Sequence, residues 1–251
     1  MISIKYDLLH MPIELTKTHD HCASGKPRLT VVMLHGIASS SITFRNALRY
    51  LEGTQSMADV RFVTFDLLGS GKSYKNNKLK YGYTDQLAAL QRSLARLRID
   101  TPLILLGHSM GTFISTRYAA THKKAIHKLI LCSPPIYTEA DLDNPAFPEA
   151  IEGFKKAVSA RNSKILKDAA FNNEMKNIVM NRKNYKTLTE LTTPAVLIYG
   201  DADPYIASQN IPATIKKNPK YLSAIKTVGR HGMSHEKYYK VREILEDELN
   251  A

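Results

Sequence analysis

The sequence contains no tryptophan, only two cysteines and no long apolar run. Cys22 and Cys132 can form at most one bridge, which excludes a fold held together by several disulfides. No stretch approaches the roughly 20 apolar residues that a membrane-spanning helix needs. An export signal would have a basic region followed by an apolar segment, and the first residues show no such pattern. We therefore expect a cytoplasmic protein with free thiols and no attachment to a membrane.

Acidic residues are also scarce, because 23 Asp and Glu oppose 35 Lys and Arg and leave a formal net charge of +12. Such an excess suits proteins that bind nucleic acids. Here, however, the basic residues are scattered through every segment, and no nucleic-acid-binding motif accompanies them. We expect a solvated basic surface without a nucleic-acid partner, and attraction of anionic substrates is the weaker alternative.

The 251 residues, 43% of them hydrophobic, suit one large domain with a single core. Short β-branched runs alternate with segments of helical period, which predicts an α/β fold: a mostly parallel eight-stranded sheet with helices on both faces. The expected strands lie at 2–8, 12–17, 29–34, 60–65, 102–107, 127–132, 195–199 and 224–228, and the first two should form an antiparallel edge hairpin. The expected helices lie at 42–52, 84–98, 110–122, 205–217 and 234–249.

Residues 136–192 interrupt this alternation, since they contain no strand pattern and begin with a stretch rich in aspartate and proline. Helical segments follow until the next strand begins. We expect a small helical cap at 136–192, inserted into a core made of residues 1–135 and 193–251. No Gly/Ser-rich linker separates this cap as an independent unit.

The strongest chemical signal is the pentapeptide Gly107-His108-Ser109-Met110-Gly111, which follows a buried strand and begins a helix. A turn this tight holds the serine in a strained backbone conformation, and the flanking glycines remove side chains that would collide. We expect Ser109 to be a nucleophile. The Met110 N–H, at the helix start, is the first expected donor of an oxyanion hole.

A second signal is His35-Gly36-Ile37, which ends the strand expected at 29–34. A loop at the carboxyl end of a neighbouring strand can bring another backbone N–H to the oxyanion, and Gly36 allows the main chain to approach closely. The Ile37 N–H is the second expected donor. Alternatively, His-Gly is only a turn that ends the strand.

The segment Gly69-Ser70-Gly71-Lys72-Ser73 resembles part of a phosphate-binding loop, but its spacing is wrong. That motif needs a glycine five positions before Gly71, where this sequence has Asp66. A carboxylate there would repel phosphate. We expect Asp66 and the glycines to stabilise a tight loop near the site.

Four motifs, taken in order, resemble those of the α/β-hydrolase superfamily along nearly the whole chain. They are His35-Gly36, Asp66 to Ser73, Gly107 to Gly111, and Gly200-Asp201-Ala202-Asp203-Pro204. The resemblance implies an α/β-hydrolase fold with a serine nucleophile, a histidine base and a carboxylate that orients the base. By position the carboxylate is that of Asp203, with Asp201 as the alternative.

The same resemblance implies that the base is His231. A glutamate follows it five residues later, at Glu236, as is usual in the family. The departure is Arg230, since the family commonly has glycine immediately before this histidine. His235 is therefore the alternative base.

No cofactor and no metal are expected. The segment His19-Asp20-His21-Cys22 offers suitable ligand types, but a zinc site needs three or four converging ligands. We expect this segment to be a flexible N-terminal loop, far in sequence from Ser109.

The expected reaction is hydrolysis of a carboxylic ester through an acyl-enzyme. Epoxide hydrolases and dehalogenases of this superfamily generally have aspartate in place of Ser109, and the missing tryptophan removes a usual halide partner. A thioester or a carbon–carbon bond flanked by carbonyls could be cleaved by the same groups. A ligand-binding receptor on the same fold is the alternative from another class.

The short and fairly polar cap suggests small or medium soluble ester substrates, with no further partner indicated. Candidate walls of the substrate pocket are Pro134, Pro135, Phe147, Phe154, Phe171, Met175 and Met180. Alternatively, the aromatic residues among them form the core of the cap itself.

Overall fold

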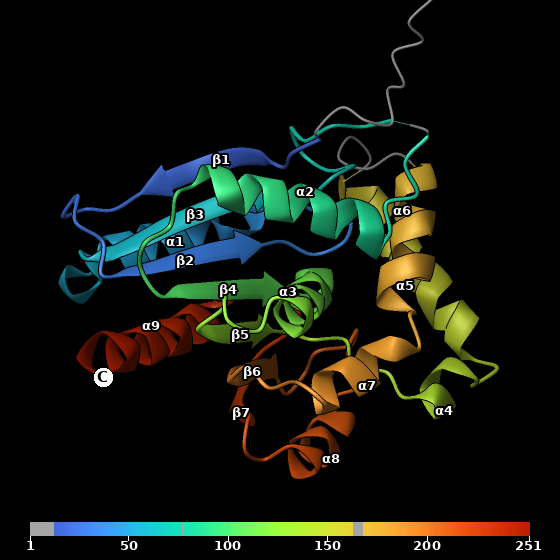
Figure 1. Ribbon diagram of the computed structural model, residues 1–251. Coiled ribbons are helices and arrows are strands. Elements are labelled where there is room, and N and C mark those ends of the chain that lie inside the picture. Colours follow the sequence, from blue (N-terminus) through green and yellow to red (C-terminus); the bar gives the residue numbers. More distant parts are fainter. Residues whose placement is uncertain (1–12, 77, 163–167) are drawn as a thin grey trace, which may run out of the picture.

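The computed structural model describes residues 13–76, 78–162 and 168–251 (Figure 1). Within these ranges one seven-stranded sheet has the order β1-β3-β2-β4-β5-β6-β7. The strands are β1 (Thr16–His21), β2 (Leu29–Leu34), β3 (Val60–Asp66), β4 (Leu103–His108), β5 (Lys128–Cys132), β6 (Ala195–Gly200) and β7 (Leu222–Thr227). β1 pairs antiparallel with β3, and the other pairs are parallel. The expected mostly parallel sheet is confirmed.

Helices cover both faces of this sheet (Figure 1). The core helices are α1 (Arg45–Glu52), α2 (Tyr83–Arg96), α3 (Met110–Thr121), α8 (Asn210–Lys217) and α9 (His235–Asn250). Successive residues of β2 point to opposite layers: Val31 and Met33 pack with α1 and α9, whereas Val32 and Leu34 pack with α2 and α3. All four side chains are fully buried, which explains why β2 is an uninterrupted apolar run.

The N-terminal edge of the sheet differs from the prediction. The strand expected at 12–17 is wrong in position, because β1 begins only at Thr16, and the strand expected at 2–8 lies outside the described residues. β1 is a half-exposed polar strand, so hydrophobic alternation does not mark it. Its side chains have polar partners instead: His19 Nε2 lies 2.5 Å from Glu52 Oε1, and Arg61 Nε donates to Asp20 Oδ1 (2.7 Å). This segment is therefore a strand rather than the flexible loop that we expected.

One helix start is also wrong. The helix expected at 205–217 begins only at Asn210, as α8. The preceding residues form turns, and the Tyr205 N–H donates to Asp203 Oδ1 at 3.0 Å. A carboxylate that accepts from the backbone two residues later stabilises a turn in competition with a helix.

A group of helices connects β5 to β6, where we expected the cap. They are α4 (Glu139–Leu142), α5 (Phe147–Asn162), α6 (Asp168–Glu174), the π-helical turn η4 (Met175–Val179) and α7 (Lys183–Thr189). In Figure 1 they lie beyond the carboxyl ends of the central strands. Phe171, Met175 and Ile178 belong to the same apolar cluster as Leu34 and Leu105. The cap helices and the sheet therefore share one core.

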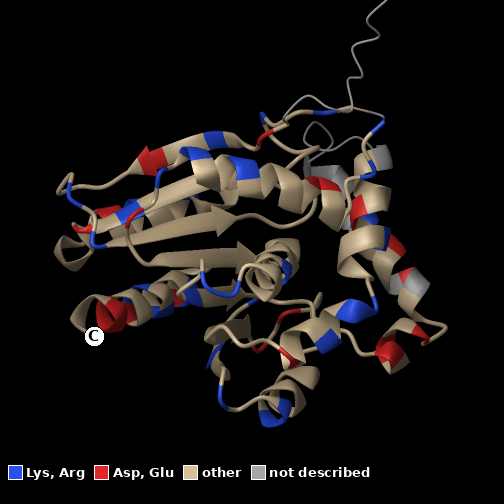
Figure 2. Ribbon diagram, in the orientation of Figure 1, with Lys and Arg blue, Asp and Glu red and all other residues tan. Residues whose placement is uncertain are grey.

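The surface is basic along several helices. In Figure 2, Lys and Arg residues lie on α2, α8 and α9 as well as on the cap helices. The positive charge is thus distributed in this view rather than gathered in one patch. Within the described ranges, no helix is both long enough and apolar enough to cross a membrane.

Candidate active site

Ser109 occupies the sharp turn between β4 and α3. Its backbone has φ 53° and ψ −121°, in a region that residues with a side chain rarely adopt. Main-chain hydrogen bonds hold it there: the Ser109 N–H donates to the Cys132 carbonyl, and the Thr112 N–H donates to the Ser109 carbonyl, both at 2.9 Å. The strained turn predicted from the sequence is present.

The turn lies very close to the end of β2. A Cβ atom at Gly111 would be 2.0 Å from the Leu34 carbonyl oxygen, and one at Gly107 would be 2.5 Å from the Gly111 carbonyl oxygen. A Cβ atom at Gly36 would lie 2.8 Å from the Ser109 Cβ. Only glycine fits at these three positions, and the loop after β2 therefore lies directly against Ser109.

His35 fixes that loop. Its Nδ1–H donates to the Gly36 carbonyl (2.7 Å), while its Nε2 accepts from the Leu67 N–H (2.9 Å). Complete burial lowers the pKa of His35, so the ring is neutral and can make both contacts at once. Ile37, two residues on, lines a cavity together with Ser109.

Asp66 stabilises the neighbouring loop, as expected. Its Oδ1 accepts from the Ser41 N–H and its Oδ2 accepts from the Lys72 N–H, both at 2.8 Å. A Cβ atom at Gly71 would overlap this carboxylate, at 2.1 Å from Oδ2. The carboxylate thus occupies the space inside the loop that a phosphate would need.

His231 and Asp203 face each other across two loops. Asp203 follows β6 and His231 follows β7, and these strands are neighbours in parallel pairing. The His231 Nδ1 lies 2.9 Å from Asp203 Oδ2 and 3.0 Å from Oδ1. His231 also lines the cavity that Ser109 lines.

The Asp203 carboxylate is held in its ionised form. Burial of the side chain works to raise its pKa, but the hydrogen bond and charge of His231, the Tyr205 N–H and the nearby Lys237 together lower the pKa below its ordinary value. An ionised partner at Nδ1 leaves the Nε2 atom of His231 as the free acceptor of a proton.

The two alternative residues make other contacts. Asp201 Oδ1 accepts from the Gly229 N–H at 3.0 Å, so this carboxylate holds the loop that precedes His231. His235 is exposed at the start of α9, and its ring packs edge-on against Tyr50 and Tyr238. Neither residue lines the cavity beside Ser109.

Lys237 is a buried residue that sequence reasoning missed. Its ammonium group donates to the Arg230 carbonyl (2.6 Å), the Gly232 carbonyl (2.9 Å) and the Ser133 hydroxyl (2.7 Å). Ser133 in turn donates to the His231 carbonyl at 3.0 Å. These bonds hold the backbone on both sides of His231. Their only signal in the sequence is a lysine in the first turn of the following helix.

His108, next to Ser109, supports the same loop. Its Nε2–H donates to the His231 carbonyl (2.8 Å), and the two rings lie 5.2 Å apart. Burial, with a smaller contribution from the neighbouring His231, lowers the pKa of His108 to about 3. His108 is therefore neutral at physiological pH and places no positive charge beside His231.

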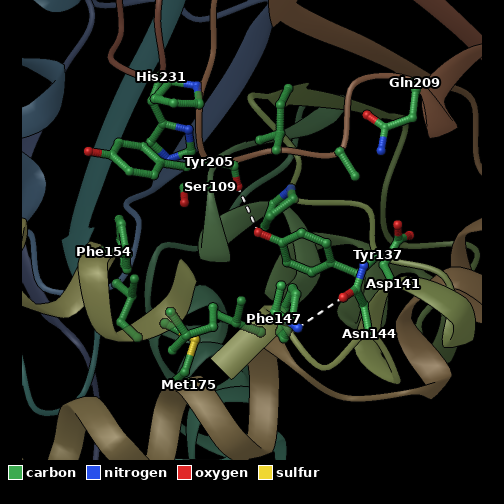
Figure 3. A pocket seen from close by; sticks show the side chains of 18 residues that line it. Ser109, Tyr137, Asp141, Asn144, Phe147, Phe154, Met175, Tyr205, Gln209 and His231 are labelled. Carbon is green, nitrogen blue, oxygen red and sulfur yellow. Dashed lines mark hydrogen bonds between the residues drawn. The ribbon is translucent and has the colours of Figure 1, made fainter. Parts of the chain in front are cut away.

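Ser109 and His231 open into a cavity of about 300 Å³ (Figure 3). Of the walls expected from the sequence, Pro135, Phe147, Phe154 and Met175 line it, whereas Pro134, Phe171 and Met180 do not. Phe171 is buried in the common core, and Met180 packs against that core. Sequence reasoning missed the polar and aromatic lining residues Tyr137, Asp141, Asn144, Tyr205 and Gln209.

Metal-ligating side chains do not converge in the part of the chain that the structure describes. Within it, no group of three or more His, Cys, Asp and Glu residues is arranged to hold a metal ion. The side chains of His19 and Asp20, considered above as ligands, are engaged with Glu52 and Arg61.

Comparison with known proteins identifies the fold family. A family model described as alpha/beta hydrolase fold matches residues 30–176, more than half of the chain. The solved structure of an esterase from Exiguobacterium antarcticum superposes with a TM-score of 0.71, covering 95% of this chain and 98% of that one at 18% identity. At this identity the likeness shows the fold alone.

Sequence relatives match over shorter stretches. "Probable lysophospholipase BODYGUARD 1" of Arabidopsis thaliana is 34% identical over 114 residues, which are 45% of this chain and 24% of that protein. "Lipase 1" of Psychrobacter immobilis is 24% identical over 205 residues, which are 81% of this chain and 59% of that protein. In both cases the match spans less than two thirds of the relative's length.

Gly111→Ala tests the close approach of the turn to β2. A methyl group 2.0 Å from the Leu34 carbonyl oxygen forces α3 or the strand end to move, so we expect the free energy of unfolding to fall by about 2 kcal/mol or more. Gly153→Ala in α5 is the matched control, because its Cβ would meet open space. Chemical denaturation measures both, and equal effects would contradict the packing described.

Lys237→Met tests the clamp behind His231. The Ser133 hydroxyl and the carbonyls of residues 230–232 lose the bonds from the buried ammonium group, so we expect the unfolding free energy to fall by about 1–3 kcal/mol. Lys240→Met is the matched control on the same helix. Lys240 pairs with the partly exposed Glu243 (2.8 Å), and its replacement should lower the unfolding free energy by less than about 1 kcal/mol. A Lys237 variant as stable as the control would show that the clamp contributes nothing.

Proposed function

Because the chain belongs to the α/β-hydrolase fold family, we propose that it is a serine hydrolase that cleaves carboxylic esters of small or medium substrates. Ser109 is the nucleophile, His231 the general base and Asp203 the carboxylate that orients the base. The observation that carries the proposal is the 2.9 Å contact between His231 Nδ1 and Asp203 Oδ2 at the cavity that Ser109 also lines.

In the first step, Ser109 Oγ attacks the ester carbonyl carbon while His231 Nε2 takes the hydroxyl proton. The carbonyl oxygen becomes an oxyanion, for which the N–H groups of Met110 and Ile37 are the proposed donors. Met110 is the first residue of α3, so the helix dipole also favours the negative charge. The close packing of Gly36 on Ser109 supports the placement of Ile37.

In the second step, the tetrahedral intermediate collapses, and the proton on His231 passes to the leaving alkoxide. An acyl group then remains on Ser109 Oγ. Water enters, gives its proton to His231 Nε2 and attacks the acyl carbon, which releases the acid and restores Ser109. The ionised Asp203 stabilises the imidazolium form of His231 in both steps.

The size of the cavity supports substrates of small or medium length. About 300 Å³ lies at the lower end of the range for ligand pockets. The names of the relatives, a probable lysophospholipase and a lipase, support ester cleavage as the reaction. Thioesterases and hydrolases of carbon–carbon bonds use the same three groups, so relative kcat/KM values on matched esters, thioesters and β-diketones decide between them.

Ser109→Ala tests the nucleophile. We expect kcat/KM for p-nitrophenyl acetate to fall by about 10³-fold or more with the fold intact, and covalent labelling by a fluorophosphonate to disappear. Ser223→Ala, at an exposed position of β7, is the control and should retain both. Turnover that survives in the Ser109 variant would exclude the proposed mechanism.

Paired variants test the other two roles. We expect His231→Ala and Asp203→Asn each to lower kcat by about 10³-fold or more, whereas His235→Ala and Asp201→Asn change it little. Steady-state kinetics and thermal melting are measured together, because only loss of activity without loss of folding is informative. A collapse of kcat in the His235 or Asp201 variant would transfer the role to that residue.

A further inference from the structure

Among the described residues that line the cavity, one side chain is acidic and none is basic other than that of His231. Among its described lining residues, Asp141 is the only carboxylate, and Lys and Arg are missing, although the chain has 35 Lys and Arg against 23 Asp and Glu. An anionic substrate would find no cation in this lining to pair with. A cationic substrate would find a carboxylate.

The Asp141 carboxylate is fixed through one of its two oxygens. Oδ2 accepts from the Thr138 N–H, the Thr138 hydroxyl and the Asn210 side-chain amide, each at 2.7 Å. Among the described residues no hydrogen bond goes to Oδ1. Partial burial works to raise the pKa of Asp141, but these hydrogen bonds lower it below its ordinary value. The group is therefore ionised at neutral pH, with one oxygen left for a ligand.

Aromatic rings line the same cavity as this carboxylate. Tyr137 and Phe147 both line the cavity and pack edge to face, with ring centroids 4.9 Å apart. The Tyr137 hydroxyl already donates to the Tyr205 carbonyl (2.7 Å), so Tyr137 offers its ring to a ligand rather than its hydroxyl. Aromatic faces attract cations, and cages of aromatic side chains bind quaternary ammonium groups.

The acidic end and the nucleophile lie on different sides of one cavity. Figure 3 shows Ser109 and His231 at one side of the cavity and Asp141 at the other, with the ring of Tyr137 between them. A molecule whose ester carbonyl reaches Ser109 can therefore extend its other end towards Asp141. The cavity of about 300 Å³ restricts that molecule to a short chain.

We propose that the Asp141 end of the cavity binds an alkylammonium group, so that the preferred substrates are short esters with a positive charge a few bonds from the ester. The substrate preference rests on the proposed ester hydrolysis, whereas the binding of the cation does not. The net charge of the protein opposes cations only weakly, because salt screens it over distances of about 8 Å, and Asp141 acts at contact.

Binding to the Ser109→Ala protein, which cannot turn the ligand over, tests the inference. Calorimetry at physiological salt compares acetylcholine with dimethylbutyl acetate, its neutral isostere in which carbon replaces the nitrogen. We expect acetylcholine to bind about tenfold more tightly, through the carboxylate and the aromatic rings together. Equal affinities would overturn the proposal.

Asp141→Asn, added to the Ser109→Ala protein, identifies the group responsible. The amide oxygen can take the place of Oδ2 and keep the bonds from Thr138 and Asn210, so only the charge is lost. We expect the preference to fall to about twofold or less. Asp143→Asn is the matched control, since Asp143 is exposed and pairs with Arg182 outside the cavity, and it should leave the preference unchanged. A preference that survives in the Asp141 variant would overturn the assignment.

Phe147→Leu keeps Asp141 intact, and it tests the site independently if the Asp141→Asn variant fails to fold. It should lower the affinity for acetylcholine about threefold and leave that for the isostere unchanged. Hydrolysis of both esters by the unmodified protein separates the two proposals. Preferential binding without hydrolysis would reject the esterase function alone, and hydrolysis without preferential binding would reject the cation site alone.

Discussion

The site depends on the close approach of three backbone segments at Ser109: the end of β2, the turn between β4 and α3, and the end of β5. β2 and β4 are parallel neighbours, so their carboxyl ends meet at one edge of the sheet, and Gly36 and Gly111 remove the side chains that would keep the two loops apart. The strain of a positive φ at Ser109 is tolerated because packed backbone surrounds the turn and Cys132 supplies a hydrogen bond. The result is a serine side chain held in a fixed position at the wall of the cavity.

The loop that carries His231 is held by hydrogen bonds from buried side chains. Here a buried ammonium group, that of Lys237, donates to the carbonyls of Arg230 and Gly232 and to the Ser133 hydroxyl. His108 adds a neutral donor to the His231 carbonyl. Among the described residues, the side chain of His231 then has Asp203 as its hydrogen-bond partner, at Nδ1. Polar groups in the core thus position an imidazole that is itself part of a cavity wall.

Much of this arrangement could be predicted from the sequence, because the signals are local. The glycines around Ser109 and the alternation of apolar strands with periodic helices follow from steric and packing rules that act within a few residues. β1 could not be placed, since it is polar and is stabilised by partners far along the chain. The same holds for Lys237 and Asp141: their roles depend on how a helix and the cap are oriented, which no short pattern records.

Trapping the covalent intermediate tests the central claim most directly. The protein is mixed with p-nitrophenyl acetate, quenched in acid within the first turnovers, digested and mapped by mass spectrometry. The account predicts an acetyl group on Ser109, and a slower loss of that group when His231 is replaced by alanine. An acetyl group on another residue, or steady hydrolysis with Ser109 unmodified throughout, would contradict it.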